Sequence, residues 1–309
     1  MELHQLRYFV AVAETGNFTR AAQRSNVTQP SLSQQILNLE REVGHKLFHR
    51  LGRKAVLTEA GTVFLERARR ILFEVENATR ELSDHPGLGR RIHVGAVQTV
   101  MPYLVAPVID ICRTRLTNVQ VNAREDFRRD LIEAVVEGDV DLAVVPMPVK
   151  DHRVSIEPLL TEPLLLVVGK EHPFATRPAI SLEDLSEETF ISLGDMSSLA
   201  AQTRVFFGDH QFEPRIGYRC AQVATLKRFV AMGFGISILP QIAHQPDDRD
   251  SLIYLRISGS EPTREIAVVR HLQRYQSRGA EQFLAVLREY VSANHTQHPF
   301  SGQTSPSDG

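Results

Sequence analysis

The polar side chains with the most regular spacing lie in residues 26–44, NVTQPSLSQQILNLEREVG. The front of this stretch is rich in amide and hydroxyl groups, and the back carries apolar residues at steps of three and four. A glutamine at the start of a helix can hydrogen-bond an adenine through two atoms, and serine is a small donor and acceptor. The first N–H groups of a helix can hold a phosphate. This pattern predicts a helix whose polar front contacts the edges of nucleic-acid bases.

Basic residues gather in the same part of the chain. The whole chain has a net charge of −2, but residues 1–58 contain eight Lys and Arg against four Glu, a net charge of +4. Such asymmetry indicates a polyanionic partner. We therefore predict that the front of this helix and a basic turn bind double-stranded DNA through Thr28, Gln29, Pro30, Ser31, Ser33, Gln34, Arg50, Arg53, Lys54 and Thr58.

Short helices and a hairpin are needed to hold these residues. Gly16 is expected to end a first helix, and Asn17 to cap a second. Thr28 is expected to cap the helix that follows, with Pro30 in its first turn, where a missing N–H costs nothing. Residues 46–57 read as two extended pieces around the turn at 51–54, which is typical of a wing. The pattern predicts a helix-turn-helix; an ordinary helical domain with solvated polar residues is the alternative.

A longer helix is expected after Thr58. Its apolar residues recur at steps of three and four over about three heptads. They are Gly61, Phe64, Ala68, Ile71, Val75, Ala78 and Leu82. This spacing predicts a homodimer contact through residues 61–82, although the same spacing would let the helix pack on its own domain. Residues 83–90, SDHPGLGR, are expected to form a linker because of their Pro and Gly content.

The periodicity changes at residue 91, where strand-like runs begin to alternate with helical patterns. The runs include IHVGAV, VQVNA, DLAVVP, PLLLVVG, TFISL, IGYRC, ISILP, LIYLRI and EIAVVR. The helical patterns cover residues 103–115, 129–137, 198–207, 225–232 and 276–291. Such alternation predicts βαβ units and largely parallel sheets, divided between two subdomains. Residues 295–309 have no periodicity and are expected to be a disordered tail.

Residues 2–65 resemble the N-terminal domain of LysR-type transcriptional regulators. The order of features matches without a gap: Thr28-Gln29-Pro30-Ser31, Leu39-Glu40, Gly44, Leu47-Phe48-x-Arg50 and Leu57-Thr58-x-x-Gly61. The resemblance continues through EGDVDLAVV (137–145), LLLVVGKEHPFA (164–175) and VAMGFGISILP (230–240). The chain departs from the pattern at Gln34, where many members carry a basic residue, so the base preference near that position is open.

This resemblance implies an N-terminal all-α winged helix-turn-helix (1–58) and a long dimerisation or linker helix with a hinge (59–90). It further implies a C-terminal α/β effector domain (91–294) with two lobes, like the type 2 periplasmic binding proteins. By match, lobe I covers 91–161 and 267–294, and lobe II covers 162–266. The partners implied are a promoter dyad in double-stranded DNA, a small-molecule effector and further copies of the chain, as a homotetramer. RNA polymerase is considered as an additional partner.

An effector is expected at the carboxyl ends of strands, near helix N-termini. The loops 97–102, 194–198 and 220–225 qualify and would favour a small organic anion, most simply a carboxylate. The predicted contacts are Gln98, Thr99, Val100, Phe127, Met147, Ser197, Gln222 and Thr225, with Phe127 and Met147 as an apolar wall. The resemblance supports Thr99 and Ser197 best. The alternative is that these residues only cap helices.

Other functions find little support in the sequence. We expect no cofactor, no metal and no enzymatic activity, because HExxH, Cys/His ligand spacing and Gly-x-Ser-x-Gly are lacking. The chain shows no signal peptide or membrane span, and together with the basic helix-turn-helix this argues against a solute-binding protein. Two cysteines far apart in the sequence fit a reduced, cytoplasmic setting, and we expect a nucleoid-associated protein. Cys112 and Cys220 leave a thiol-based redox regulator as the main alternative: Cys112 is expected in the core, and Cys220 lies beside the expected cleft.

Overall fold

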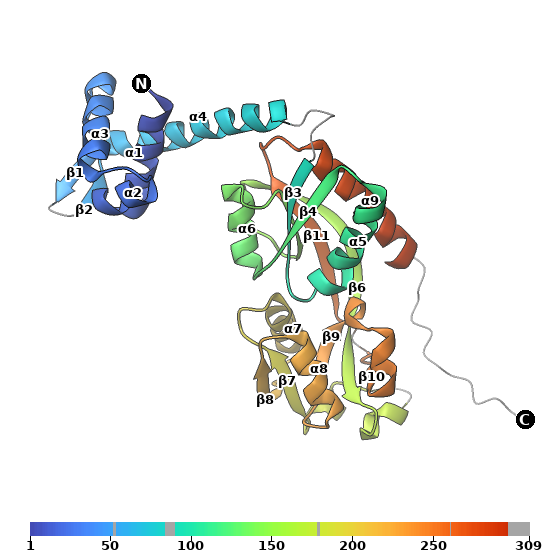
Figure 1. Ribbon diagram of the computed structural model, residues 1–309. Helices are drawn as coiled ribbons and strands as arrows, with labels where there is room; N and C mark the ends of the chain where they lie inside the picture. Colours follow the sequence, from blue (N-terminus) through green and yellow to red (C-terminus); the bar gives the residue numbers. More distant parts are fainter. Residues whose placement is uncertain (52–53, 84–89, 178–179, 260, 296–309) are drawn as a thin grey trace, which may run out of the picture. The chain divides into compact units, whose positions relative to one another are not determined.

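The computed structural model describes residues 1–51, 54–83, 90–177, 180–259 and 261–295. The chain divides into two compact units, Met1–Pro86 and Gly87–Gly309 (Figure 1). The expected turn residues 52–53, the linker residues 84–89 and the tail residues 296–309 lie outside the described part.

The first unit is a small helical domain with a hairpin and a long helix (Figure 1). Its elements are α1 (Leu3–Thr15), α2 (Phe18–Arg24), α3 (Gln29–Val43), β1 (Phe48–Leu51), β2 (Lys54–Leu57) and α4 (Glu59–Ser83). Gly16 ends α1 in the left-handed conformation, at φ 61°, as predicted. The Asn17 side chain accepts hydrogen bonds from the backbone N–H groups of Thr19 and Arg20, so it caps α2.

The two halves of helix α4 differ in how far their apolar side chains are buried. Gly61 and Ala68 are buried, and Phe64 packs on the core of the first unit. A side chain at Gly61 would meet the backbone oxygen of Leu47, so only glycine fits there. Farther along, Leu82 is 81% exposed. The first half of the predicted apolar seam therefore packs on its own domain, whereas the second half is not covered by that domain.

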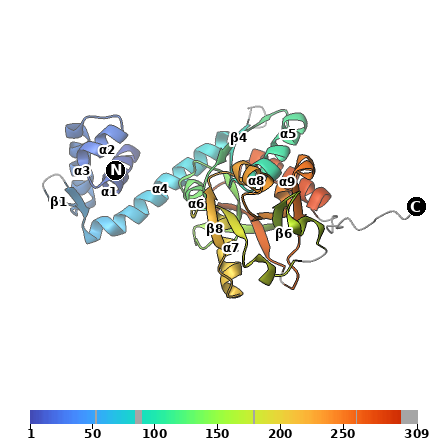
Figure 2. The ribbon, with the colours of Figure 1, turned by 90° about the horizontal axis from the view of Figure 1, so that it is seen from below.

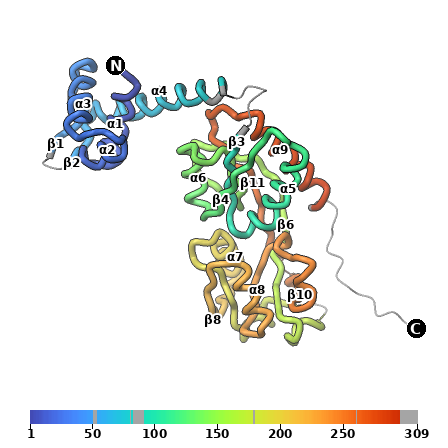
Figure 3. Tube along the Cα trace, viewed as in Figure 1, coloured from blue at the N-terminus to red at the C-terminus, as the bar shows by residue number. Residues whose placement is uncertain are grey.

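The second unit contains two hydrophobic cores, which Figure 3 shows as two groups of elements. Lobe I is built from β3 (Arg90–Ala96), β4 (Val119–Glu125), β5 (Leu142–Pro146), η1 (Met101–Val105), α5 (Ala106–Arg115), α6 (Arg128–Glu137) and α9 (Arg278–His295). Lobe II is built from β7 (Thr189–Leu193), β8 (Arg215–Cys220), β9 (Ser237–Pro240), β10 (Leu252–Leu255), α7 (Ser198–Asp209), α8 (Val223–Ala231) and the short helices η2 (Pro173–Thr176), η3 (Glu183–Leu185), η4 (Gln241–Ala243) and η5 (Pro246–Asp250).

Two strands, β6 (Val154–Gly169) and β11 (Thr263–His271), connect the lobes (Figure 1). Figure 2 shows the chain from below, with β6 labelled. The strand order is β10-β6-β11-β5-β3-β4, with β9 also paired to β6. The first half of β6 pairs with β11, and its second half pairs with β9 and β10. The same strand thus contributes to both cores.

The prediction of largely parallel sheets was wrong. In the described residues, β3 pairs in parallel with β4 and β5, and β7 with β8, but the pairs made by β6 and β11 are antiparallel. The alternation of strands and helices holds within each lobe, whereas β6 and β11 run between the lobes and pair with each other in the antiparallel direction. The prediction also missed residues 154–162 of β6, whose polar and apolar residues do not form a clear strand-like run.

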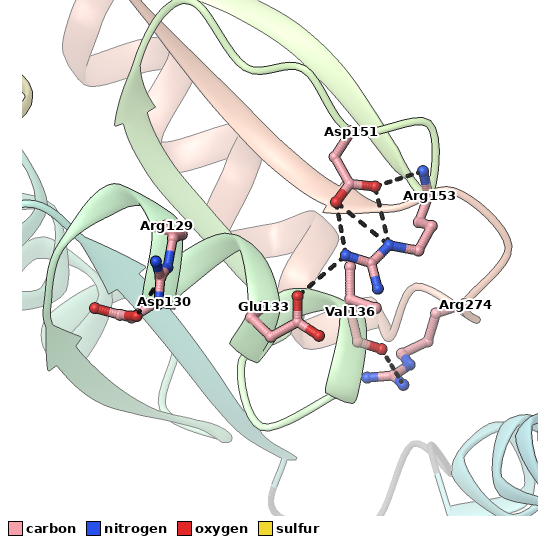
Figure 4. Close-up of polar contacts among 7 residues, drawn as sticks. All are labelled: Arg129, Asp130, Glu133, Val136, Asp151, Arg153 and Arg274. Carbon is pink, nitrogen blue, oxygen red and sulfur yellow. Dashed lines mark hydrogen bonds and ion pairs between the residues drawn. The ribbon is translucent and has the colours of Figure 1, made fainter. Parts of the chain in front are cut away.

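The far end of α6 is fixed by two arginines from neighbouring loops (Figure 4). Arg153 contacts Asp151 at 2.7 Å and Glu133 of α6 at 3.0 Å. Arg274 donates to the backbone oxygen of Val136, in the last turn of α6. A cation at this position stabilises the C-terminal end of the helix, because that end of the helix dipole carries a partial negative charge. These contacts fix the helix whose opposite end, at Arg128, borders the pocket described below.

Candidate functional site

The front of α3 is an exposed polar surface. Thr28, Gln29, Pro30, Ser31 and Gln34 are exposed, and Ser33 is half-buried. On the opposite side, Leu32, Ile36 and Leu39 are completely buried in the core of the first unit. The sequence prediction of a polar front and an apolar back therefore agrees with the burial of each side chain.

The polar side chains of α3 are bonded to one another in the free protein. Gln29 Nε2 donates to Ser33 Oγ at 2.9 Å, and Gln34 Nε2 donates to Asn38 Oδ1 at 3.0 Å. Thr28 Oγ1 accepts from the Ser31 backbone N–H at 3.4 Å, which is a long cap. Little free energy is lost when these exposed hydrogen bonds are exchanged for others, because water or a base edge can replace each partner. The surface is therefore ready to take up new hydrogen bonds.

The hairpin places further basic groups beside this domain. Arg50 and Lys54 are exposed, and the Arg50 guanidinium lies 4.7 Å from the centre of the Phe18 ring. Arg53 lies outside the described residues. Thr58 has a structural task, since its hydroxyl donates to the Lys46 oxygen and accepts from the Gly61 N–H. The geometry therefore gives no support to the prediction that Thr58 contacts DNA.

A second site is a pocket of about 180 Å³ between the lobes of the second unit. It is lined by the loop after β3, by the turn from β4 to α6 and by the start of α7: Val97, Gln98, Thr99, Glu125, Asp126, Phe127, Arg128, Ser197 and Ser198. The pocket thus brings together four of the predicted contacts, Gln98, Thr99, Phe127 and Ser197.

The other four predicted contacts lie outside this pocket. Val100 is completely buried in the core of lobe I, because the chain turns inward there towards η1. Met147 packs against the same core, and its backbone oxygen accepts a hydrogen bond from Gln202. Gln222 and Thr225 are exposed at the start of α8, so the third predicted loop does not reach the pocket.

Thr99 is held by a buried ion pair that the sequence analysis missed. Arg264 Nη1 donates to Thr99 Oγ1 at 2.8 Å, and Nη2 donates to the Thr99 oxygen at 3.1 Å. Arg264 Nε also donates to Glu162 Oε1 at 2.8 Å, and Glu162 Oε2 accepts from the Ile242 N–H of η4 at 2.7 Å. The side chains of Arg264 and Glu162 are 0% and 5% exposed. Burial lowers the pKa of Arg264, and Glu162 opposes this shift.

The direction of these hydrogen bonds fixes what the pocket offers to a ligand. A guanidinium has donors only, so Thr99 Oγ1 must accept from Arg264, and the Thr99 hydroxyl proton stays available for another acceptor. Ser197 Oγ similarly accepts from the Leu199 N–H at 3.2 Å, which leaves its proton available. Thr99 from lobe I and Ser197 from lobe II are therefore two hydroxyl donors in one pocket.

Charged groups line the same pocket. Asp126 accepts from Arg124 at 2.8 Å and from the Phe127 N–H, and these bonds lower the pKa of its carboxyl. Arg128 donates to the Pro146 oxygen at 3.2 Å, and partial burial lowers the pKa of its guanidinium. Arg128 and Glu125 were not predicted as contacts, although both directly flank the predicted Phe127 region.

A larger hollow of about 250 Å³ lies inside lobe II, between α7 and strands β7 and β8. Rings such as Phe190 and Phe207 line it, and the nearby Arg204 is already paired with Asp195 at 2.8 Å. None of the predicted contacts lines it. Occupation of a hollow within one lobe does not in itself change the arrangement of the lobes, so the smaller pocket between them is the candidate site.

Both cysteine thiols are buried in separate cores. Cys112 is 0% exposed in lobe I, and burial raises the pKa of its thiol to about 11. Cys220 is 6% exposed in lobe II, and burial raises the pKa of its thiol as well. Both thiols therefore stay protonated at neutral pH, and the thiolate is the reactive form.

The described residues contain no group of three His, Cys, Asp or Glu side chains placed to hold a metal ion. None of the helices in the described part of the chain combines the length and the apolar character that crossing a membrane requires.

Known proteins resemble the chain over nearly its whole length. A 35% identical relative, the hydrogen peroxide-inducible genes activator of Dickeya chrysanthemi, matches over 87% of this chain and 89% of its own. The Hca operon transcriptional activator HcaR of Escherichia coli is 30% identical over 95% of this chain and 99% of its own. A full-length OxyR variant from Pseudomonas aeruginosa is 26% identical, with a TM-score of 0.65 and coverage of 94% of both chains. Full-length BenM is 27% identical, with a TM-score of 0.59 and coverage of 95% of this chain and 97% of its own.

Two family models account for both units. The bacterial regulatory helix-turn-helix protein model of the lysR family matches residues 3–62, and the LysR substrate binding domain model matches residues 85–292. The exposed polar helix lies in the first match, and the pocket between the lobes lies in the second. The chain therefore belongs to the LysR family of DNA-binding transcriptional regulators.

Proposed function

We propose that a small organic carboxylate binds between the two lobes and controls how this LysR-type regulator binds DNA. The observation that carries the proposal is the pair of hydroxyl donors, Thr99 and Ser197, which come from different lobes to one pocket. A carboxylate accepts hydrogen bonds from both hydroxyls at once, and charge-assisted hydrogen bonds of this kind are the stronger ones.

The control would follow from differential binding. A ligand that contacts Thr99 and Ser197 together favours the lobe arrangement in which both reach it, and disfavours others. Arg264 and Glu162 connect Thr99 to β6 and β11, the strands that join the lobes, and to η4 of lobe II. A change at Thr99 therefore acts directly on the connecting strands.

The DNA-binding domains of two copies of the chain would act as a pair. We propose that the exposed second half of α4, which includes Ile71 and Leu82, forms the homodimer contact. The dimer would present two α3 helices to the half-sites of a promoter dyad. A homotetramer then requires a second contact between copies of the chain.

A thiol-based redox regulator is the second candidate function. Its support is that a relative bears the name hydrogen peroxide-inducible genes activator. Burial of both thiols and their raised pKa values argue against it. Hydrogen peroxide is therefore expected to leave DNA binding unchanged in the wild type and in Cys220→Ala. A peroxide effect that Cys220→Ala abolishes would put the redox function first.

Thermal melting of the full chain against a panel of small carboxylates, neutral metabolites and amines tests the proposal. A ligand at about 100 times its Kd adds roughly 2.7 kcal/mol to stability, which shifts the melt visibly. A carboxylate that stabilises the wild type but not Thr99→Ala would support the pocket. Stabilisation by neutral compounds alone would contradict it.

A further inference from the structure

The acidic side of the pocket between the lobes points to a second requirement on its ligand. Glu125, the last residue of β4, and Asp126 line the same pocket as the hydroxyl groups at the start of α7. Asp126 is committed to Arg124 and to the Phe127 N–H. In the described part of the chain, the exposed carboxylate of Glu125 takes part in no hydrogen bond or ion pair. The pocket therefore contains one carboxylate that is available to a ligand.

Glu125 lines the pocket and acts electrostatically on Tyr103. Burial raises the pKa of Tyr103 to about 12, and the charges of Asp248 and Glu125 contribute to the shift. Tyr103 packs against the cores of both lobes, and Asp248 belongs to η5 of lobe II. The charge of Glu125 therefore acts on a side chain that packs against both lobes.

One carboxylate of the pocket makes it less suited to a simple anion. The ionisable lining groups are Glu125, Asp126 and Arg128, and Asp126 is already paired with Arg124, so Glu125 is the lining carboxylate without an ion pair among the described residues. Like charges repel, and the repulsion grows where water is partly excluded. A ligand with only a carboxylate would bring a second unpaired negative charge close to Glu125. A ligand that also carries a cationic amine would pair with Glu125 and reduce this cost.

The size of the pocket limits the ligand further. About 180 Å³ corresponds to the space of roughly six water molecules in the liquid. A molecule of about six to ten non-hydrogen atoms fits such a volume. Phe127, which is 41% exposed, adds an apolar surface for a short side chain.

We propose that the effector is a small α-amino acid, with its carboxylate on the Thr99 and Ser197 hydroxyls and its ammonium group on Glu125. This inference rests on the proposed function of the pocket and narrows its ligand class. Thr99 and Ser197 supply the affinity for the carboxylate, and Glu125 discriminates between an amino acid and the same acid without its amine.

Calorimetric titration of the full chain with matched pairs tests this inference. The probes are L-alanine against propionate, L-valine against 3-methylbutanoate, and L-leucine against 4-methylpentanoate. We expect at least one amino acid to bind about tenfold or more tighter than its partner. Glu125→Gln is expected to remove this preference without lowering the melting temperature of the free protein. Glu187→Gln, an exposed change outside the pocket, is expected to keep the preference.

The outcomes separate the two proposals. If the carboxylates bind as well as the amino acids, and Thr99→Ala weakens both, the amino-acid inference fails and the carboxylate pocket stands. If the preference for the amine survives Glu125→Gln, the role of Glu125 is wrong. If no member of either series binds, the inference fails, and the broader carboxylate panel then decides on the pocket itself.

Discussion

The front of α3 and the pocket between the lobes use polar groups in opposite ways. On α3, Gln29 and Ser33 are bonded to each other at the surface, so each bond can be exchanged for another. Between the lobes, Thr99 is 1% exposed and is held by Arg264, which is itself completely buried. The first surface can adapt to different partners. The second is organised before the ligand arrives, and it stays so because breaking it leaves a buried charge without a partner.

Replacement of Arg264 should have the largest effect. Arg264→Met leaves Glu162 buried without its cation, and loss of one member of a buried pair costs about 3–5 kcal/mol. Chemical denaturation should show this loss in the unfolding of the second unit. The double change Arg264→Met with Glu162→Gln should recover part of the stability. A loss below about 1 kcal/mol would mean that the pair does not organise the pocket.

Gln29→Ala should affect recognition rather than stability. We expect sequence discrimination to fall by about 1–3 kcal/mol, because one bidentate base contact is lost. Competition between operator and unrelated DNA at fixed salt concentration measures this change. The matched control is Gln23→Ala, an exposed change on α2. Unchanged discrimination in Gln29→Ala would remove this residue from the set that reads bases.

Thr99→Ala should combine a moderate loss of stability with a lost response. The change leaves Arg264 Nη1 without its acceptor, at a cost of about 1–3 kcal/mol. It also removes the hydroxyl proton offered to the ligand, so the effect of a ligand on DNA binding should disappear. Basal DNA binding should persist, since α3 lies in the other unit. Thr99→Ser should retain the response; loss of basal binding in Thr99→Ala would show a structural role instead.

The sequence predicted α3 well because everything that defines its two faces lies within its own 15 residues and the N-cap that precedes them. Thr28, Pro30 and the spacing of Leu32, Ile36 and Leu39 are sufficient. The pocket is different, because its residues come from three separated segments. The strand-end rule found Thr99 and Ser197, but it also selected Gln222, which the fold places elsewhere.

Arg264 and Glu162 could have been noticed as charges within largely apolar strands. In TEPLLLVV (161–168) and TREIAVV (263–269), the charged residues stand next to an apolar segment, and a charge that is buried there needs a partner. The sequence could not show that they pair with each other, because this depends on the register of β6 and β11. In that register Arg264 lies opposite Glu162.

The smallest expected effect lies at the start of α3. An N-cap threonine contributes about 0.5–2 kcal/mol, but the Thr28 bond to the Ser31 N–H is long, at 3.4 Å. Thr28→Ala should therefore cost about 0.5 kcal/mol. Asn17→Ala should cost more, since Asn17 accepts two bonds at 2.8 and 3.1 Å. Thermal unfolding of both variants compares the caps. An equal or larger loss in Thr28→Ala would mean that the front of α3 is fixed in advance, and the contrast with the pocket would then rest on burial alone.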